Sequence, residues 1–407
     1  MGSNPAAPTN RTLHAIPFPT RRELVSAPHA AASPLPRFLP LVLVALAVRF
    51  GTVALGCALA TLLPDPHTDP NTPTHFRSEL LSSNARHVEP WYRFDALWLM
   101  NVARHGYAEA RDDGGKLGVA FMPAMSATLA LAESLGLNAF WFGLIVANLA
   151  GAAGAAVFAR VAARQLNDPA TGWQTLALLL AFPTAFFYSA PYNESFGLLF
   201  TALALAAWQT NRPIKAGLSA LGGSLARMTG VALGVAAILA WLPKRERGEL
   251  WRAVAVAVGS FAGLVLFWGF LWWAVGDPFA GLKSQAMWGR SELSWKNPFR
   301  AVASIYDPAL PHWGEAFLVI GAAVLGVRAW IKRGVFWGVL TLVPVAQMFA
   351  SGTLLSGHRL ILAALPAFIE LADLLRGRRT LFLATLLGFA FAQLLLLNRY
   401  VHWQFAG

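Results

Sequence analysis

Hydrophobic residues fall into long runs separated by short polar connections. About 20 apolar residues are needed to cross a bilayer, and eleven runs approach or exceed that length: 38 to 63, 138 to 163, 171 to 189, 193 to 210, 213 to 227, 228 to 243, 250 to 275, 313 to 331, 335 to 352, 359 to 375 and 380 to 397. The two runs between 213 and 243 are short enough to be half-spans. The pattern predicts an all-α polytopic membrane protein with about 11 transmembrane helices.

Composition agrees with this pattern. The chain has 407 residues, of which 56% are hydrophobic and 13% are charged, a balance too apolar for an ordinary soluble protein. Residues 1–37 differ, because they are rich in Pro, Ala and Arg, which predicts a disordered basic cytoplasmic tail. Since no apolar run precedes Pro36, we expect no cleavable secretory signal. The transmembrane domain is expected to cover 38–407.

Charge and cysteine content exclude some classes of protein. The net charge is +12, but the basic residues are dispersed between apolar runs, so membrane orientation accounts for them better than nucleic-acid binding. The single cysteine, Cys57, excludes an intrachain disulfide framework and a multi-cysteine metal site. No spacing of His, Glu and Cys indicates a tightly held metal, and assistance by a divalent ion is left open.

Basic clusters recur at every second connection: Arg160/Arg164, Arg212/Lys215, Lys244-Arg245-Glu246-Arg247, Arg328/Lys332/Arg333 and Arg376/Arg378/Arg379. By the positive-inside rule these connections are cytoplasmic, together with the N-terminal tail. Residues 64–137 and 276–312 then form two extracytoplasmic loops. A full span at 119–135 would move every later basic connection outside, so we expect a juxtamembrane or re-entrant helix there.

The first outer loop contains an acidic residue, Asp95, that opens a short apolar helix. On a helical wheel Asp95 falls on the apolar side, among Trp98, Leu99 and Val102, whereas His105 falls on the polar side. A purely structural alternative remains open for this helix. Asp is a favoured N-cap and the Gly after His105 is a natural C-terminal residue, so Asp95 and His105 need no chemical role.

Other polar residues gather at the outer ends of the runs: Tyr192, Glu194, Arg227, Arg290, His358 and Arg359. Glu194 and Arg227 lie at or within apolar segments, where ionised groups are usually paired or functional. A structural pair between these two is the plain alternative, and Arg359 could merely snorkel towards the interface. Arg49 lies deeper in the first run, and we expect it to pack or to pair.

Four stretches resemble the polytopic GT-C glycosyltransferases and, within them, the second mannosyltransferase of GPI-anchor synthesis (PIG-V-like) with its bacterial relatives. They are Phe94-Asp95-Ala96-Leu97-Trp98 through Arg104-His105-Gly106-Tyr107, then Ala120-Phe121-Met122-Pro123, then Phe182-Pro183 through Tyr192-Asn193-Glu194-Ser195, and Arg227-Met228-Thr229-Gly230. Phe94 stands where tryptophan is usual, Met125 where a second proline is common, and Met228-Thr229 where Ser-Asn is usual. These departures affect the sugar and acceptor more than the reaction class.

The resemblance implies a GT-C-type fold and a bacterial cytoplasmic-membrane enzyme. Its activity would be inverting transfer of a sugar, with mannose expected, from a polyprenyl-phosphate donor to an acceptor hydroxyl of a lipid, glycan or protein outside the membrane. Asp95 would be the general base. Arg227, Arg359 and Arg290 would balance the departing phosphate, and Glu194 and Tyr192 would orient hydroxyls. His105 and His358 would line the same substrate site.

A transporter or lipid-linked sugar flippase is the alternative from another class, since it also needs many spans and buried charges. Such proteins are typically built from internal repeats with broken helices at matched positions. The sequence shows no such repeat, because the large loop at 64–137 has no counterpart in the second half of the chain.

Overall fold

The computed structural model describes residues 34–63, 79–80, 83–110, 118–243, 245–290, 294–307 and 312–406. Leu35–Gly407 forms one compact unit, to which the following description refers. Regular structure in the described ranges is entirely helical. The prediction for the tail at 1–37 falls mainly on residues outside these ranges.

Five helices are long and apolar enough to cross a membrane. They are α1 (Phe38–Leu62), α5 (Ala139–Leu166), α10 (Arg247–Val275), α13 (Trp313–Arg333) and α17 (Arg379–Val401). Many of their large apolar side chains are exposed, and each would lose roughly 1.5–3 kcal/mol of transfer free energy if left in water. The predicted all-α membrane protein is therefore confirmed in its helical and apolar character, with five helices of the described chain meeting the length for a span.

The remaining long runs form shorter helices: α6 (Pro169–Ala181), α7 (Glu194–Gln209), α8 (Pro213–Ala226), α9 (Val231–Trp241), α14 (Val335–Ala350) and α16 (Pro366–Leu375). At 1.5 Å per residue they are about 15–24 Å long, less than the roughly 30 Å of a hydrocarbon core. The two runs between 213 and 243 are short, as expected. The other helices named here are shorter than the hydrophobic runs that predicted them.

Proline explains where two of the predicted runs are interrupted. The run 171–189 ends as an α-helix at Ala181, before Phe182-Pro183, and continues as the 3₁₀ helix η3 (Ala185–Tyr188). The run 359–375 begins as α15 (Gly357–Leu360) and η7 (Ile361–Ala363), and α16 restarts at Pro366. Proline lacks an N–H and disfavours helical geometry in the preceding residue, so α6 stops before Pro183. Pro366 instead occupies the first turn of α16, where a helix tolerates proline.

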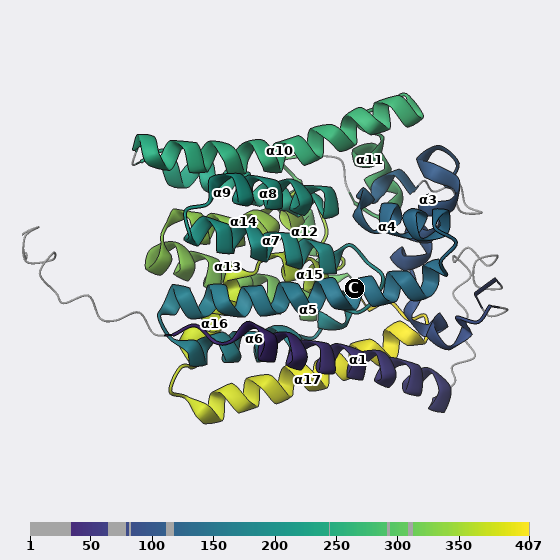
Figure 1. Ribbon diagram of the computed structural model, residues 1–407, viewed down its shortest axis with the longest axis horizontal. Coiled ribbons are helices and arrows are strands. Elements are labelled where there is room, and N and C mark those ends of the chain that lie inside the picture. Colours follow the sequence, from purple (N-terminus) through teal and green to yellow (C-terminus); the bar gives the residue numbers. More distant parts are fainter. Residues whose placement is uncertain are drawn as a thin grey trace, which may run out of the picture. The chain divides into compact units, whose positions relative to one another are not determined.

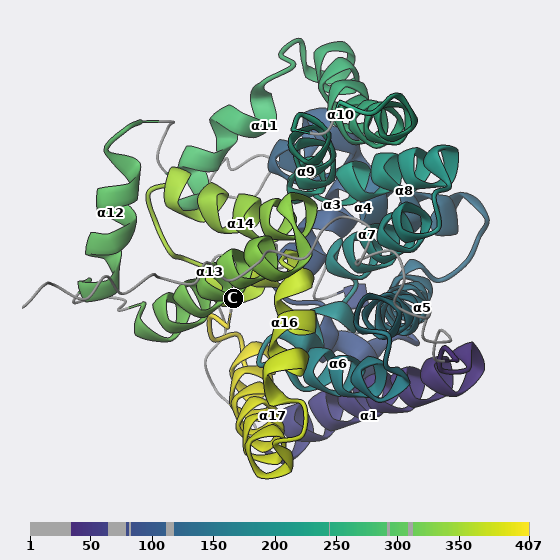
Figure 2. The same ribbon diagram turned by 90° about the vertical axis from the view of Figure 1, so that its left-hand side faces the viewer.

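The helices lie side by side (Figure 1). Short connections between them lie at one end, and the longer connections lie at the other. Five short connections, with the described basic residues in them or in the adjoining helix ends, lie together at one end, facing the viewer in Figure 2. At the opposite end lie α3 (Asp95–Glu109), α4 (Pro123–Ser134) and α11 (Ala280–Lys283). Helix α4 has 12 residues, about 18 Å, so this part of the 119–135 segment is too short to span.

Close contact between α8 and α10 depends on glycine. A Cβ atom added to Gly259 would overlap the backbone carbonyl of Gly217, whereas one added to Gly269, on the same helix, would meet open space. Small residues allow membrane helices to approach closely and gain van der Waals contact.

We expect Gly259→Ala to destabilise the protein by about 1–3 kcal/mol, because the α8 backbone must move to admit the methyl group. Thermal unfolding in detergent measures the effect, and Gly269→Ala is the matched control. Equal unfolding temperatures for the two variants would show that α8 and α10 are not in such close contact.

Candidate functional site

Four charged side chains, far apart in sequence, meet in one cluster. Arg359 contacts Asp95 through Nη2 and Oδ2 at 2.6 Å and contacts Glu194 through Nε and Oε1 at 2.5 Å. Arg227 forms an ion pair with the same oxygen of Glu194. We call Asp95, Glu194, Arg227 and Arg359 the acid–arginine cluster. Asp95 and Arg359 are 264 positions apart, so only the folded chain brings them together.

Local structure explains the place of each residue in the acid–arginine cluster. Asp95 and Glu194 lie in the first turns of α3 and α7, where the partial positive charge of a helix N-terminus favours an acid. Arg227 has extended backbone geometry at the end of α8, before the 3₁₀ helix η4 (Met228–Gly230). Phe94, rather than Asp95, occupies the N-cap position of α3 and provides no side-chain cap. The carboxylate of Asp95 therefore pairs with Arg359 instead of capping its own helix.

The two carboxylates differ in accessibility. The Asp95 side chain is 21% exposed, whereas that of Glu194 is 1% exposed. Asp95 is therefore the more accessible of the two acids. The second oxygen of Glu194, Oε2, is buried and has no hydrogen-bond partner among the described residues.

A small cavity adjoins Glu194 and Arg227. Its volume is about 20 Å³, and its other polar lining residues are Tyr188, Thr201 and Thr229. An unpaired buried carboxylate oxygen costs free energy unless a polar partner reaches it. The cavity offers room for a partner about the size of a water molecule.

Arg290, from the second predicted outer loop, adds a third cation to the site. Burial lowers the pKa of Arg290, the positive charges of Arg359 and Arg227 lower that pKa further, and the charge of Asp95 opposes them. Because arginine stays protonated in proteins, three guanidinium groups and two carboxylates interact electrostatically at this site. The site therefore carries an excess of one positive charge.

Aromatic rings support the central arginine. The guanidinium carbon of Arg359 lies 4.9 Å from the ring centre of Phe187 and 4.6 Å from that of Tyr192, distances typical of cation–π contacts. Tyr192 is fully buried, and its hydroxyl donates a hydrogen bond to the Arg93 carbonyl at 2.8 Å. The Tyr192 hydroxyl is therefore already engaged as a donor and its ring supports Arg359, and the expectation that Tyr192 orients substrate hydroxyls stays a prediction.

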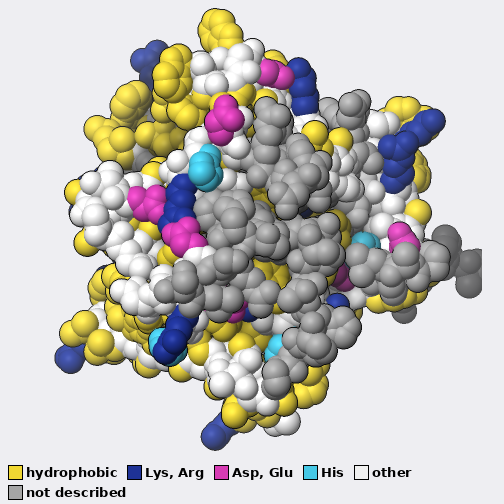
Figure 3. Space-filling model, turned by 90° about the vertical axis from the view of Figure 1, so that its right-hand side faces the viewer, with side chains coloured by type: hydrophobic (Ala, Val, Ile, Leu, Met, Phe, Trp, Pro, Cys, Tyr) yellow, Lys and Arg dark blue, Asp and Glu magenta, His cyan; other side chains and the backbone are white. Residues whose placement is uncertain are grey.

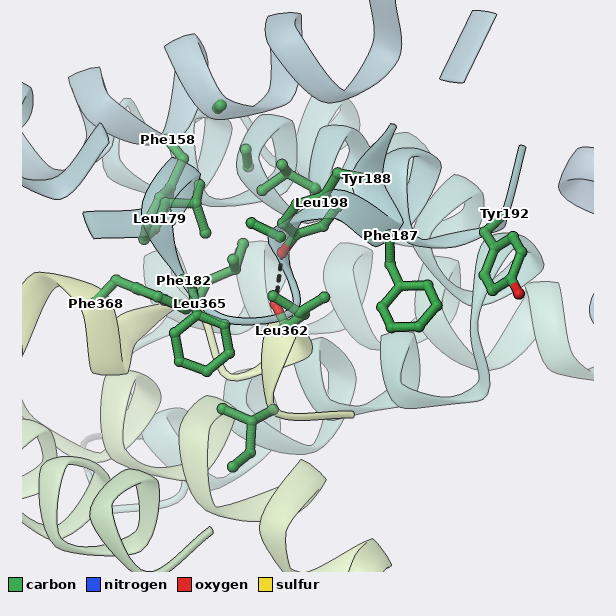
Figure 4. Close-up of a cluster of buried hydrophobic side chains, with 14 of the residues drawn as sticks. Phe158, Leu179, Phe182, Phe187, Tyr188, Tyr192, Leu198, Leu362, Leu365 and Phe368 are labelled. Carbon is green, nitrogen blue, oxygen red and sulfur yellow. Dashed lines mark hydrogen bonds between the residues drawn. The ribbon is translucent and has the colours of Figure 1, made fainter. Parts of the chain in front are cut away.

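Hydrogen bonds tie the stretches of the sequence pattern to one another. Asn193 donates to the Met122 carbonyl at 2.9 Å and accepts from the Met125 amide at 2.8 Å, which joins the starts of α4 and α7. The Tyr188 hydroxyl donates to the Leu362 carbonyl at 3.0 Å, next to buried Phe187 and Leu365 (Figure 4). The positions of Glu194 and Arg359 are thus held by the same apolar core.

Two further supports were not predicted from the sequence. Phe94 has a φ angle of +47°, an uncommon value for a bulky residue, and its ring packs against Tyr400 and Trp403, each with centroids 6.0 Å apart. Arg93 forms a bidentate ion pair with Glu89 and donates to the carbonyl that follows Tyr400. The only sequence signal was the polar and aromatic ending of the last apolar run.

The ring of His358 is paired outside the acid–arginine cluster, and His105 lies further along α3 than Asp95. His358 Nδ1 is 3.2 Å from a carboxylate oxygen of Glu315, and its Nε2 is 2.7 Å from the Ala406 carbonyl. His105 is exposed on α3, ten residues after Asp95, which is roughly 15 Å along a helix. Of the residues expected in the site, contacts join Asp95, Tyr192, Glu194, Arg227 and Arg359, and Arg290 interacts with them electrostatically.

Arg49 behaves as expected for a deeply placed cation. It is buried in the middle of α1, donates to the Ser189 hydroxyl at 3.2 Å and lies 5.2 Å from the centre of the Tyr188 ring. This residue joins α1 to the segment that precedes Glu194.

On the face of the molecule at the α3 end, charged, histidine and hydrophobic side chains are interspersed (Figure 3). In the described ranges, no group of three or more His, Cys, Asp or Glu side chains is arranged to hold a metal ion. No model of a known protein family matches the chain, and no curated protein matches its sequence. The site itself and the sequence pattern are therefore the features that indicate a function.

Proposed function

We propose that this protein is a membrane glycosyltransferase of GT-C type, which transfers a sugar from a polyprenyl-phosphate donor to an acceptor hydroxyl. Mannose is the first sugar to test, because of the resemblance to PIG-V-like enzymes. The observation that carries the proposal is the acid–arginine cluster with Arg290, in which one accessible carboxylate adjoins an excess of positive charge.

Each step of the reaction has a residue suited to it. Asp95 would accept the proton of the acceptor hydroxyl. The oxygen of that hydroxyl would attack the anomeric carbon from the side opposite the phosphate. The bond between that carbon and the phosphate oxygen would break, and polyprenyl phosphate would leave with both electrons of the bond. The configuration at the anomeric carbon would invert, so no covalent sugar–enzyme intermediate is needed.

The arginines suit a phosphate leaving group. Guanidinium groups form strong charge-assisted, often bidentate, hydrogen bonds with phosphate. Because Arg290 is repelled by Arg227 and Arg359, an arriving phosphate would relieve that repulsion and balance the excess charge. Glu194 would hold Arg227 and Arg359 in place, and its Oε2 would remain available for a hydroxyl of the sugar or acceptor.

The test is transfer by the purified protein in nanodiscs. We expect mannose from a polyprenyl-phosphate donor to appear on a lipid, glycan or peptide acceptor, detected by mass spectrometry, with an anomer opposite to that of the donor shown by NMR. Movement of the intact lipid-linked sugar between leaflets of proteoliposomes, without transfer to any acceptor, would favour the flippase instead.

The same proposal assigns an orientation in a bacterial cytoplasmic membrane. The five basic connections would face the cytoplasm by the positive-inside rule, and the acid–arginine cluster would face outward. A lipid donor could then enter from the bilayer.

Cysteine labelling tests this orientation. In a Cys57→Ala background, Leu135→Cys, exposed at the end of α4, should react with an impermeant maleimide in intact cells. Arg378→Cys, exposed in the connection before α17, should react only after permeabilisation. The opposite result would place the acid–arginine cluster at the cytoplasmic side.

A further inference from the structure

A short helix in the second predicted outer loop presents large apolar side chains away from the protein. It consists of α12 (Asn297–Ala303) and η6 (Ser304–Tyr306). Its outward-facing residues Phe299, Val302 and Tyr306 are 68%, 49% and 67% exposed, and their spacing of three and four positions places them in one stripe of a helix. Trp295, in the turn that precedes α12, is 77% exposed.

The opposite side of this helix attaches it to the protein. Asn297 donates to the Ala350 carbonyl at 2.7 Å, and Ser304 Oγ accepts from the Leu354 amide at 3.2 Å. Ala301 is fully buried between them. The helix is therefore fixed in orientation, and its apolar stripe faces outward because of that attachment.

The stripe continues into the exposed surface of α13, one of the five helices long enough to span. The α13 surface has exposed fractions between 50% and 78% at Trp313, Phe317, Ile320, Val324, Val327 and Ile331, again with alternating spacings of four and three. The rings of Tyr306 and Trp313 are in edge contact, with centroids 4.7 Å apart. The exposed apolar surface of α13 is thus continuous with that of α12.

The direction of α12 fits a position at the membrane surface. Figure 2 shows α12 at the edge of the bundle and lying across the view, whereas α5 and α10 are seen nearly end-on. Aromatic residues prefer the boundary between headgroups and hydrocarbon, and helices with such a face lie in the plane of that boundary.

Two cations flank the stripe. Lys296 and Arg300 are exposed, and at 100° per residue they fall between the apolar stripe and the attached side. The ammonium group of Lys296 lies 5.7 Å from the centre of the Trp295 ring, and Arg300 donates to Asn297 at 3.4 Å. Within the described ranges neither takes part in an ion pair, so both remain available to anionic groups at the membrane surface.

We propose that Trp295, Lys296, Phe299, Arg300, Val302 and Tyr306 form a lipid-binding surface, which we call the α12 surface. It sits among the headgroups of the leaflet nearest the acid–arginine cluster and binds anionic phospholipid. The aromatic stripe supplies contact with acyl chains, and the two cations supply selectivity for negative headgroups, worth several-fold in affinity for each cation. This inference does not depend on glycosyl transfer.

Fluorescence quenching tests the position of the α12 surface. Phe299→Cys, in the Cys57→Ala background, would carry an environment-sensitive fluorophore in nanodiscs of phosphatidylcholine with phosphatidylglycerol. We expect stronger quenching by a nitroxide near the headgroup than by one at the acyl-chain end. Val324→Cys, halfway along α13, is the control and should show the reverse order. Absence of quenching at Phe299→Cys by either nitroxide would overturn the proposal.

A second arm tests the preference for anionic lipid. Titration of phosphatidylglycerol into phosphatidylcholine nanodiscs should change the fluorescence at Phe299→Cys. Adding Lys296→Gln and Arg300→Gln should lower the affinity for phosphatidylglycerol, taken from this titration, about 30-fold. The control pair Arg86→Gln and Lys283→Gln, which removes two exposed cations elsewhere at the same end, should leave the response unchanged.

Three results would contradict the preference for anionic lipid. The response could be independent of lipid charge, or it could appear only when two copies of the protein share a nanodisc, which would indicate a protein interface. Saturation by equimolar polyprenyl phosphate in a neutral bilayer would show that the surface binds that lipid rather than phospholipid.

Discussion

Replacing Asp95 by Asn should lower sugar transfer about 10²–10⁴-fold, the range that a general base contributes, while the protein stays folded. Asn has nearly the same shape and keeps an oxygen that can accept a hydrogen bond from Arg359. It cannot take a proton from the acceptor hydroxyl. Because Arg359 also contacts Glu194, its charge remains partly balanced in the variant.

Initial rates with a polyprenyl-phosphate sugar, together with the unfolding temperature in detergent, measure the effect of Asp95→Asn. The matched control is Asp277→Asn, which removes a carboxylate paired with Lys283 at 2.7 Å near the same end of the molecule. We expect near-normal rates for this control. Full activity of Asp95→Asn would show that Asp95 is not the base.

Replacing Glu194 by Gln should produce the largest loss of stability, about 3–5 kcal/mol, as is typical when one partner of a buried ion pair is removed. Glu194 is paired with both Arg227 and Arg359. Without the Glu194 carboxylate, Arg227 loses its partner. The positive charges of Arg227 and Arg359, which repel Arg290, are then less well balanced. Unfolding temperature and the yield of monodisperse protein measure the loss.

The double variant Glu194→Gln with Arg227→Gln separates pairing from substrate binding. If the two residues mainly compensate each other, the double variant should regain part of the stability lost by Glu194→Gln alone, which a double-mutant cycle quantifies. We also expect Arg227→Gln alone to raise the KM for the donor clearly, with only a small decrease in the unfolding temperature. Lost stability with unchanged activity per folded molecule would instead favour a purely structural pair.

Several helix boundaries could not be read from hydrophobicity alone. The run at 171–189 looks continuous in the sequence, but α6 ends at Ala181 and Pro183 follows it. The run at 359–375 also looks continuous, but it breaks at Ala364 and α16 begins at Pro366. Hydrophobicity indicates that a segment prefers an apolar environment, whereas helix continuity depends on backbone hydrogen bonds that proline interrupts.

The candidate site shows a similar division. Acidic and basic residues at the ends of apolar runs were recognisable because a charge near hydrocarbon needs a partner or a function. The sequence did not reveal that Arg359 would contact both Asp95 and Glu194. It also did not reveal that the Tyr192 hydroxyl would be engaged by the Arg93 carbonyl, or that His358 would face Glu315.

The sequence by itself determined that the chain forms apolar helices, and it determined which few charged residues must be compensated. These properties depend on local composition and on the cost of leaving a charge in an apolar environment. Only the tertiary structure decided which charges meet, which carboxylate stays accessible, and which aromatic rings support them. Such contacts join positions as far apart as Asp95 and Arg359, and their geometry depends on the packing of the whole helical core.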